Sequence, residues 1–143
     1  MADVKIIRLS NPTVHVLDCI AHGVFDEAIK PSQRDAFLAE ENHHMLLAVS
    51  DGQVVGMASA VKYLHPDKLP SLWINEVGVG DDWLRQGIAK KLMDTMLELS
   101  EELGCEEAWL GTESDNAPAL ALYRSLNGEE DAGAYFTWDT EAD

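Results

Sequence analysis

The central part of the sequence constrains the fold more than any other part. Residues 72–79 are typical of a β-strand, and residues 80–82, Gly-Asp-Asp, mark a turn. Apolar residues then recur at helical spacing over residues 85–103, and Gly104 is a typical C-terminal cap. Residues 108–111 follow as another strand. Because two strands joined by a long helix pair in parallel, this segment predicts a crossover unit of an α/β protein.

The flanking sequence predicts further strands and helices around this unit. Residues 50–52, Ser-Asp-Gly, separate two β-type runs and are typical of a hairpin turn. The remaining expected elements are strands at residues 4–9, 45–49, 54–64 and 134–138 and helices at residues 10–24, 31–41 and 117–126. The order predicts one α/β (α+β) domain over residues 1–143, with a mixed twisted sheet flanked by about four helices.

Charge narrows the class of partners. The 143-residue chain has 10 Lys and Arg against 26 Asp and Glu, a formal net charge of −16. Thirteen of the acidic residues and one basic residue lie in residues 98–143. Because nucleic acids and anionic membranes are bound through Lys and Arg, we expect neither as a partner and favour a cationic small molecule or a basic protein. Solubility alone is the alternative explanation of this charge.

The sequence predicts a protein of the reducing cytoplasm. Cys19 and Cys105 lie far apart without CxxC spacing, so we expect free thiols and no bound metal. No window approaches the roughly 18 apolar residues that a bilayer requires. The N-terminal residues also lack the pattern of a secretion signal.

Residues 84–91, Leu-Arg-Gln-Gly-Ile-Ala-Lys-Lys, form the most informative motif. They follow a strand and begin a helix, and the small residues Gly87 and Ala89 leave backbone N–H groups of the first turn accessible. Arg85, Lys90 and Lys91 lie beside them in an otherwise acidic chain. A helix N-terminus with such neighbours predicts a pyrophosphate site. The alternative is that Gly87 permits close packing of helix and sheet.

Residues 84–89 resemble the acetyl-coenzyme A (acetyl-CoA) loop of the GNAT family of N-acetyltransferases, whose pattern is Arg/Gln-x-x-Gly-x-Gly/Ala. The resemblance covers nearly the whole chain and implies the GNAT fold with acetyl-CoA as cosubstrate. Leu84 departs from the pattern, and we expect Arg85 beside it to compensate. The cosubstrate-binding residues that the resemblance implies are Val77, Gly78, Val79, Leu84, Arg85, Gln86, Gly87, Ile88, Ala89, Lys90 and Asn116.

Residues 116–123 carry a second family feature. They resemble the Asn-x-x-Ala-x-x-Leu-Tyr segment that follows the fifth GNAT strand. Asn116 is a typical helix N-cap, and Tyr123 lies two turns later on the same helix face. The resemblance implies that Asn116 contacts the pantetheine arm and that the Tyr123 hydroxyl protonates the CoA thiolate as it leaves. A core tyrosine with a satisfied hydroxyl is the alternative.

Glu76 is the expected general base. It lies on the strand before the loop among apolar residues, where a desolvated carboxylate binds a proton more readily. Strict alternation places Glu76 with Ile74 and Gly78 on one face, towards either solvent or a substrate cleft, and the resemblance favours the cleft. We therefore expect Glu76 to take the proton of the acceptor ammonium, directly or through water.

The predicted acceptor is an aminoglycoside. Residues 73–79, 85–89, 121–123 and 134–139 together resemble the aminoglycoside 3-N-acetyltransferases, which confer antibiotic resistance. Carboxylates attract the several ammonium groups of such a substrate. The candidate substrate-binding residues are Glu76, Glu113, Asp115 and Asp139, with Glu129, Glu130 and Asp131 as further candidates.

Other functions fit the same sequence. A GNAT enzyme of this kind could instead acetylate a polyamine, a small amine or a protein lysine. A non-catalytic module that binds acetyl-CoA is a third reading, from a different class. A homodimer is an expectation from the family alone.

Overall fold

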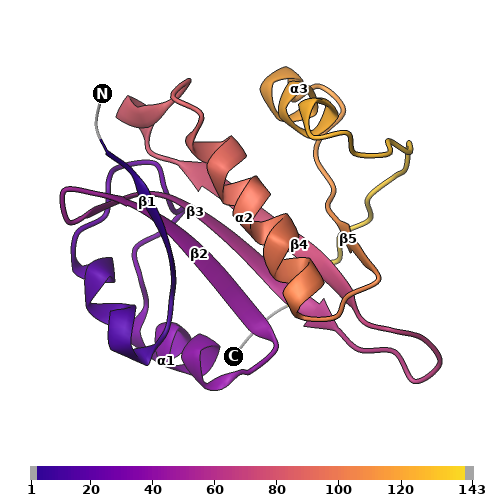
Figure 1. The fold of residues 1–143 in the computed structure, drawn as a ribbon, viewed down its shortest axis with the longest axis horizontal. Helices are drawn as coiled ribbons and strands as arrows, with labels where there is room; N and C mark the ends of the chain where they lie inside the picture. Colours follow the sequence, from indigo (N-terminus) through magenta and orange to yellow (C-terminus); the bar gives the residue numbers. More distant parts are fainter. Residues whose placement is uncertain (1–2, 141–143) are drawn as a thin grey trace. The chain divides into compact units, whose positions relative to one another are not determined.

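A computed structural model describes residues 3–140 of the chain (Figure 1). The chain divides into two compact units, residues 1–111 and residues 112–143. The single domain expected over residues 1–143 therefore stays a prediction. No helix of the described part is long and apolar enough to cross a membrane.

The first unit contains a five-stranded mixed sheet. Its strands are β1 (Lys5–Arg8), β2 (His43–Ser50), β3 (Gln53–Tyr63), β4 (Ser71–Val79) and β5 (Glu107–Trp109), in that spatial order. From β1 to β4 each strand is antiparallel to its neighbour, whereas β4 and β5 pair in parallel. The helix α2 (Ile88–Glu102) connects the parallel pair. The crossover unit that residues 72–111 predict is therefore confirmed.

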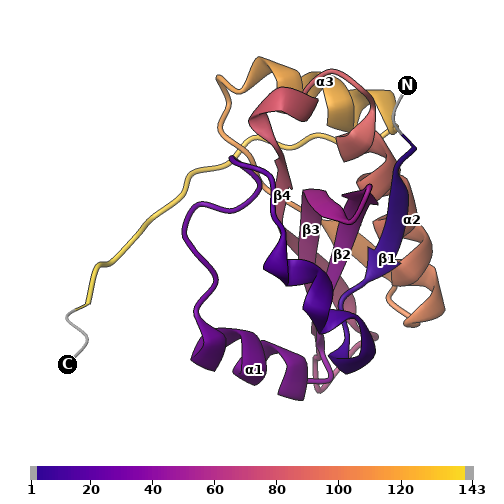
Figure 2. The ribbon, with the colours of Figure 1, turned by 90° about the vertical axis from the view of Figure 1, so that its left-hand side faces the viewer.

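α2 lies along one face of this sheet, away from the 3₁₀ helix η1 (Asn11–Asp18) and the helix α1 (Pro31–Ala39) (Figure 2). Its buried side chains recur at helical spacing, which explains why the apolar pattern predicts it. The largest fully buried side chains of the core are Leu47, Val54, Val55, Leu72, Leu92 and Met96. The core thus lies between α2 and the central strands.

The predicted helix over residues 10–24 is too long. Its first part is the 3₁₀ helix η1, which ends at Asp18. Beyond that residue the backbone binds β3 instead. The carbonyl oxygen of Cys19 accepts from the Val54 N–H at 2.8 Å, and the Ala21 N–H donates to the Val54 carbonyl at 2.8 Å. Backbone groups engaged in this bridge cannot continue a helix.

The second unit contains the helix α3 (Ala117–Ser125). It stops as predicted at Asn127 and Gly128, where Asn127 has a φ of 63° and the Gly128 N–H donates to the Tyr123 carbonyl at 3.2 Å. The predicted strand at residues 134–138 is wrong, because these residues have no regular secondary structure. A strand requires a paired neighbour, which an alternating pattern cannot supply by itself.

Candidate functional site

The turn after β4 leads to an open helix N-terminus. The short 3₁₀ helix η2 (Asp81–Trp83) follows Gly80, and α2 begins after Gly87. Gly87 is the N-cap, without a side chain to bind the first N–H groups, and the Lys91 N–H donates to the Gly87 carbonyl at 3.1 Å. The N–H groups of the first turn before Lys91 are therefore available to an anion.

The left-handed backbone before α2 explains why this helix starts later than residue 85. Arg85 has a φ of 63° and Gly87 a φ of 77°, and neither value is compatible with a right-handed helix. A Cβ atom on Gly87 would meet no atom within 4 Å. The alternative that Gly87 permits close packing is therefore wrong. Gly56 of β3 has that role, because a Cβ there would meet Cγ2 of Ile88 at 2.9 Å.

Positive charge gathers at this helix N-terminus. Arg85, Lys90 and Lys91 are exposed, and within residues 3–140 none of the three forms an ion pair. Leu84 beside them is 56% exposed, so it offers apolar contact and no charge at the position where the family pattern has Arg or Gln. Free cations and free N–H groups together suit a pyrophosphate, which fits the expected cosubstrate.

β4 contains a β-bulge at Asn75. Ile74 pairs with Ala60 and Glu76 pairs with Ser59, so Asn75 is an extra residue on β4. Cross-strand partners project to the same side of a sheet. The bulge therefore places Ile74 and Glu76 on opposite faces, and the predicted shared face of these two residues is wrong. No local sequence signal reveals this bulge.

Glu76 lies on the face opposite α2. Gly78 shares that face, where a Cβ on Gly78 would collide with the carbonyl oxygen of Val24. Ile74 is buried, whereas Glu76 is exposed. The expected desolvation of Glu76 among apolar neighbours is therefore wrong, and its carboxylate is open to solvent and to a substrate.

The β5 side of β4 is only partly paired. β5 pairs with Ser71, Leu72 and Trp73, whereas β4 continues to Val79. Within the described residues no strand pairs with this edge of β4 beyond Trp73. Backbone groups along this edge, in the stretch that includes Val77 and Val79, can therefore bind an extended ligand. The same stretch leads directly into the loop at residues 84–91.

The second unit carries Asn116 and Tyr123 on α3. The Asn116 side-chain oxygen accepts from the Ala119 N–H at 3.2 Å, so Asn116 is the predicted N-cap. Burial raises the pKa of the Tyr123 hydroxyl above its ordinary value, so this group is protonated at neutral pH. A protonated phenol can donate a hydrogen bond or a proton.

The candidate acidic residues of the second unit differ in their availability. Glu113, Asp115 and Asp139 are exposed. Glu130 instead binds Arg124 through both carboxylate oxygens, at 2.7 and 2.9 Å, and this interaction lowers the pKa of the Glu130 carboxyl. Glu130 is thus a weaker candidate for a cationic ligand than the sequence suggests. No group of side chains in residues 3–140 is arranged to hold a metal ion.

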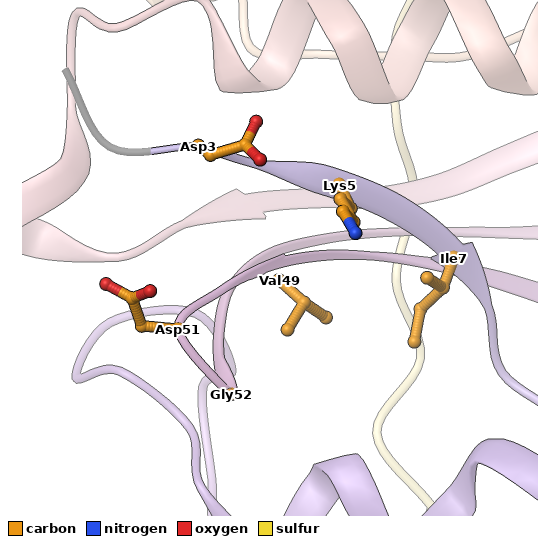
Figure 3. A pocket seen from close by; sticks show the side chains of 6 residues that line it. All are labelled: Asp3, Lys5, Ile7, Val49, Asp51 and Gly52. Atoms are coloured by element: carbon orange, nitrogen blue, oxygen red, sulfur yellow. The ribbon is translucent and has the colours of Figure 1, made fainter.

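A hollow of about 320 Å³ lies elsewhere, at the β1 edge of the sheet (Figure 3). Its lining residues are Asp3, Lys5, Ile7, Val49, Asp51 and Gly52. None of them is a predicted site residue. The hollow is lined by two carboxylates and one ammonium group and does not include the helix N-terminus at Gly87.

A strand that leads into an open, cationic helix N-terminus defines a class of α/β proteins that bind phosphate-bearing ligands. The model of the acetyltransferase (GNAT) family matches residues 13–128, which include β4, the loop and α3. The chain belongs to this family, whose cosubstrate is acetyl-CoA.

Two curated relatives have similar sequences. Human N-acetyltransferase 8 is 30% identical over 102 residues, and mycothiol acetyltransferase of Saccharomonospora viridis is 31% identical over 107 residues. These alignments cover 71% and 72% of this chain but 45% and 35% of the relatives. The chain thus spans less than half the length of either relative.

Solved structures share the fold over nearly the whole chain. An aminoglycoside acetyltransferase from an uncultured soil metagenomic sample, in complex with trehalose, has a TM-score of 0.82 and 21% identity, and the match covers 96% of this chain and 97% of that chain. The aminoglycoside 6′-acetyltransferase AAC(6')-Iy, in complex with a CoA bisubstrate analogue, has a TM-score of 0.77 and 17% identity, over 97% of this chain and 99% of that chain. At these identities the similarity shows the fold alone.

Proposed function

We propose that this chain transfers the acetyl group of acetyl-CoA to an amino group of an aminoglycoside. One observation carries the proposal: the open helix N-terminus at Gly87, with three exposed cations beside it, follows a short turn after a strand, and within the described residues the β5-side edge of that strand has no partner strand beyond Trp73. The unpaired edge suits the pantetheine arm, and the helix N-terminus suits the pyrophosphate. Val77 to Val79 and Leu84 to Lys90 would hold the cosubstrate, with Asn116 contributing from α3.

The reaction needs proton removal from the acceptor nitrogen and proton donation to the CoA sulfur. Glu76 takes a proton from the acceptor ammonium, directly or through water, so that the neutral nitrogen attacks the thioester carbonyl. As the new C–N bond forms and the C–S bond breaks, the nitrogen loses its second proton to solvent. The Tyr123 hydroxyl protonates the departing thiolate and regains a proton from solvent. Exposure of Glu76 supports contact with a soluble acceptor, and the Tyr123 hydroxyl, whose pKa burial raises, is protonated at neutral pH and so has a proton to donate.

Charge supports a polycationic acceptor. Glu113, Asp115 and Asp139 are exposed carboxylates of a chain with a net charge of −16, and such a field raises the local concentration of cations. The sequence resemblance favours acetylation of the 3-amino group, while one of the solved structures with this fold is a 6′ enzyme. The proposal therefore includes the 3-amino group as the site of transfer, to be tested against the 6′ position.

The test measures thiol release from acetyl-CoA with three amines: the aminoglycoside sisomicin, spermidine and a lysine peptide. We expect sisomicin to be the best acceptor, with the product acetylated at one nitrogen that NMR assigns. A preference for spermidine or the peptide would move the function to another amine acetyltransferase. Tight binding of acetyl-CoA without thiol release for any amine would instead indicate a binding module.

A further inference from the structure

Two tryptophan side chains lie exposed and stacked on the sheet of the first unit. Trp73 of β4 and Trp109 of β5 are cross-strand partners, with ring centroids 5.9 Å apart and ring planes inclined by 20°. They are 37% and 50% exposed. Tryptophans usually bury most of their surface, so this pair forms a flat aromatic surface that is available to a ligand.

The aromatic pair shares its face of the sheet with Glu76. Trp73 pairs with Val61 and Glu76 pairs with Ser59, and residues two apart on β3 project to the same side. Without the bulge at Asn75, residues 73 and 76 would lie on opposite faces. The bulge therefore brings the expected general base and the aromatic surface to one side of the sheet.

A second carboxylate lies on this face. Glu107 precedes Trp109 by two residues on β5, so alternation places both on the same side, and Glu107 is exposed. Glu76 and Glu107 thus lie beyond opposite ends of the tryptophan pair along the strand direction. Electron-rich indole faces between two carboxylates are complementary to a cation, and tryptophan is the aromatic residue that binds cations best.

The spacing along β4 indicates the size of the ligand. Because Asn75 is an extra residue, Trp73 and Glu76 pair with Val61 and Ser59, which are two residues apart on β3, and this corresponds to about 7 Å of strand. A molecule that contacts both must therefore carry two cationic centres separated by roughly that distance. A single-ring amine or a small monoamine is too short.

The geometry points to a second acceptor subsite, in which Trp73 and Trp109 bind a distal cationic ring of a multi-ring amine while Glu76 faces the ammonium group that is acetylated. This inference rests on the proposed acetyl transfer to amines. It adds the surface that distinguishes one amine acceptor from another. Cation–π contact and stacking on the indole faces provide the affinity, and Glu107 adds a carboxylate at the far end. The subsite favours multi-ring amines over their single-ring fragments.

The experiment compares wild-type protein with Trp73→Leu and Trp109→Leu, because leucine keeps apolar bulk and removes the aromatic face. We expect KM for sisomicin to rise about tenfold in each variant, with kcat and KM for acetyl-CoA unchanged. KM for the single-ring diamine 2-deoxystreptamine should stay at its wild-type value. Trp138→Leu, an exposed tryptophan outside the sheet, is the matched control.

Three results would overturn the subsite: unchanged KM for sisomicin, an equal rise for both amines, or loss of a wild-type dimer in the variants, which would show that a second copy covers this face. Titration of sisomicin with tryptophan fluorescence as the readout tests the subsite independently of turnover. Fluorescence quenching by sisomicin that both variants lose supports the subsite even if no amine is acetylated. Acetylation of sisomicin without such quenching would instead support the acetyltransferase function and remove the subsite.

Discussion

The loop at residues 84–91 and the second unit differ in both charge and construction. The loop carries Arg85, Lys90 and Lys91 and offers backbone N–H groups that the fold itself orients. Residues 112–143 carry eight acidic residues and one basic residue, Arg124, and their exposed carboxylates depend on side chains alone. The first region therefore combines positive charge with open backbone N–H groups, whereas the second carries excess negative charge.

This difference separates two kinds of specificity. A site made of backbone geometry tolerates changes of individual side chains but not changes of φ and ψ. A region made of scattered carboxylates loses affinity in small steps as single charges are removed. Donor binding should therefore depend on a few backbone positions, and acceptor binding on several interchangeable charges.

Replacement of the proposed general base, Glu76, should have the largest effect. We expect Glu76→Gln to lower kcat by about 10² to 10⁴, because proton removal from the ammonium loses its base, with KM for acetyl-CoA unchanged. Steady-state kinetics over a range of pH measures both constants. Glu98→Gln, an exposed carboxylate on α2, is the control. Turnover that survives Glu76→Gln at neutral and high pH alike would remove Glu76 as the base.

Acid should destabilise the interior of the first unit. His44 is buried, Arg8 hydrogen-bonds to its Nδ1, and its Nε2 has no partner in the described part of the chain. Burial, followed by the charge of Arg8, lowers the pKa of His44 from 6.5 to about 4. The unfolded chain therefore binds more protons between these pH values, and stability falls as the pH drops from about 6.5 towards 4.

The expected loss is at most about 3 kcal/mol, from 1.36 kcal/mol for each pKa unit. Urea unfolding at pH 7 and at pH 4.5 measures it, and His44→Gln, which keeps an acceptor for Arg8, should flatten the dependence over this range. An equal pH dependence in wild type and variant would assign the acid sensitivity to carboxylates instead.

Substitution of Gly87 tests whether the loop depends on backbone geometry. Gly87→Ala is strained at a φ of 77° by about 1–2 kcal/mol, although its methyl group meets no atom within 4 Å. We expect KM for acetyl-CoA to rise about tenfold and KM for the amine to stay constant. Gly52→Ala is a matched control, because Gly52 has a φ of 75° and equally open surroundings. The same kinetic change in both variants would show a general loss of stability rather than a loop effect.

Single carboxylates of the second unit should have the smallest effects. We expect Glu113→Gln to raise KM for sisomicin about threefold at low salt and less at high salt, because exposed charges are screened. Glu130→Gln should change it less, since Arg124 already binds that carboxylate. If KM for sisomicin changes neither with these substitutions nor with salt, the excess of acidic residues serves solubility rather than acceptor binding.

Local patterns were sufficient to predict most of the first unit. The crossover, the hairpin at residues 50–52 and the helix start after Gly87 follow from apolar periodicity and from glycine positions. The bulge at Asn75 does not, because register is set by packing across β3 and β4 rather than by the residues of β4 alone. The predicted alternation therefore grouped Glu76 correctly with Gly78 but wrongly with Ile74, and the aromatic surface at Trp73 and Trp109 was missed.

The second unit was harder to predict for a related reason. α3 carries its own start and stop signals at Asn116 and Asn127, which act within one helix. The expected strand at residues 134–138 depends on a partner strand, and no residue type specifies one. Nor does the sequence separate a free carboxylate from one that is paired, as the Arg124–Glu130 contact illustrates.

The open space around Gly87 has a consequence for chirality. A left-handed φ strains an L-residue by about 1–2 kcal/mol, whereas the empty surroundings of Gly87 place no restriction on side-chain volume. The position should therefore accept a D-amino acid. The favoured φ values of a D-residue are positive, because they mirror the negative values that L-residues prefer. A semisynthetic protein with D-alanine at this position should keep the geometry of the helix start that L-alanine disturbs, so that handedness, rather than size, is the property for which glycine is required there.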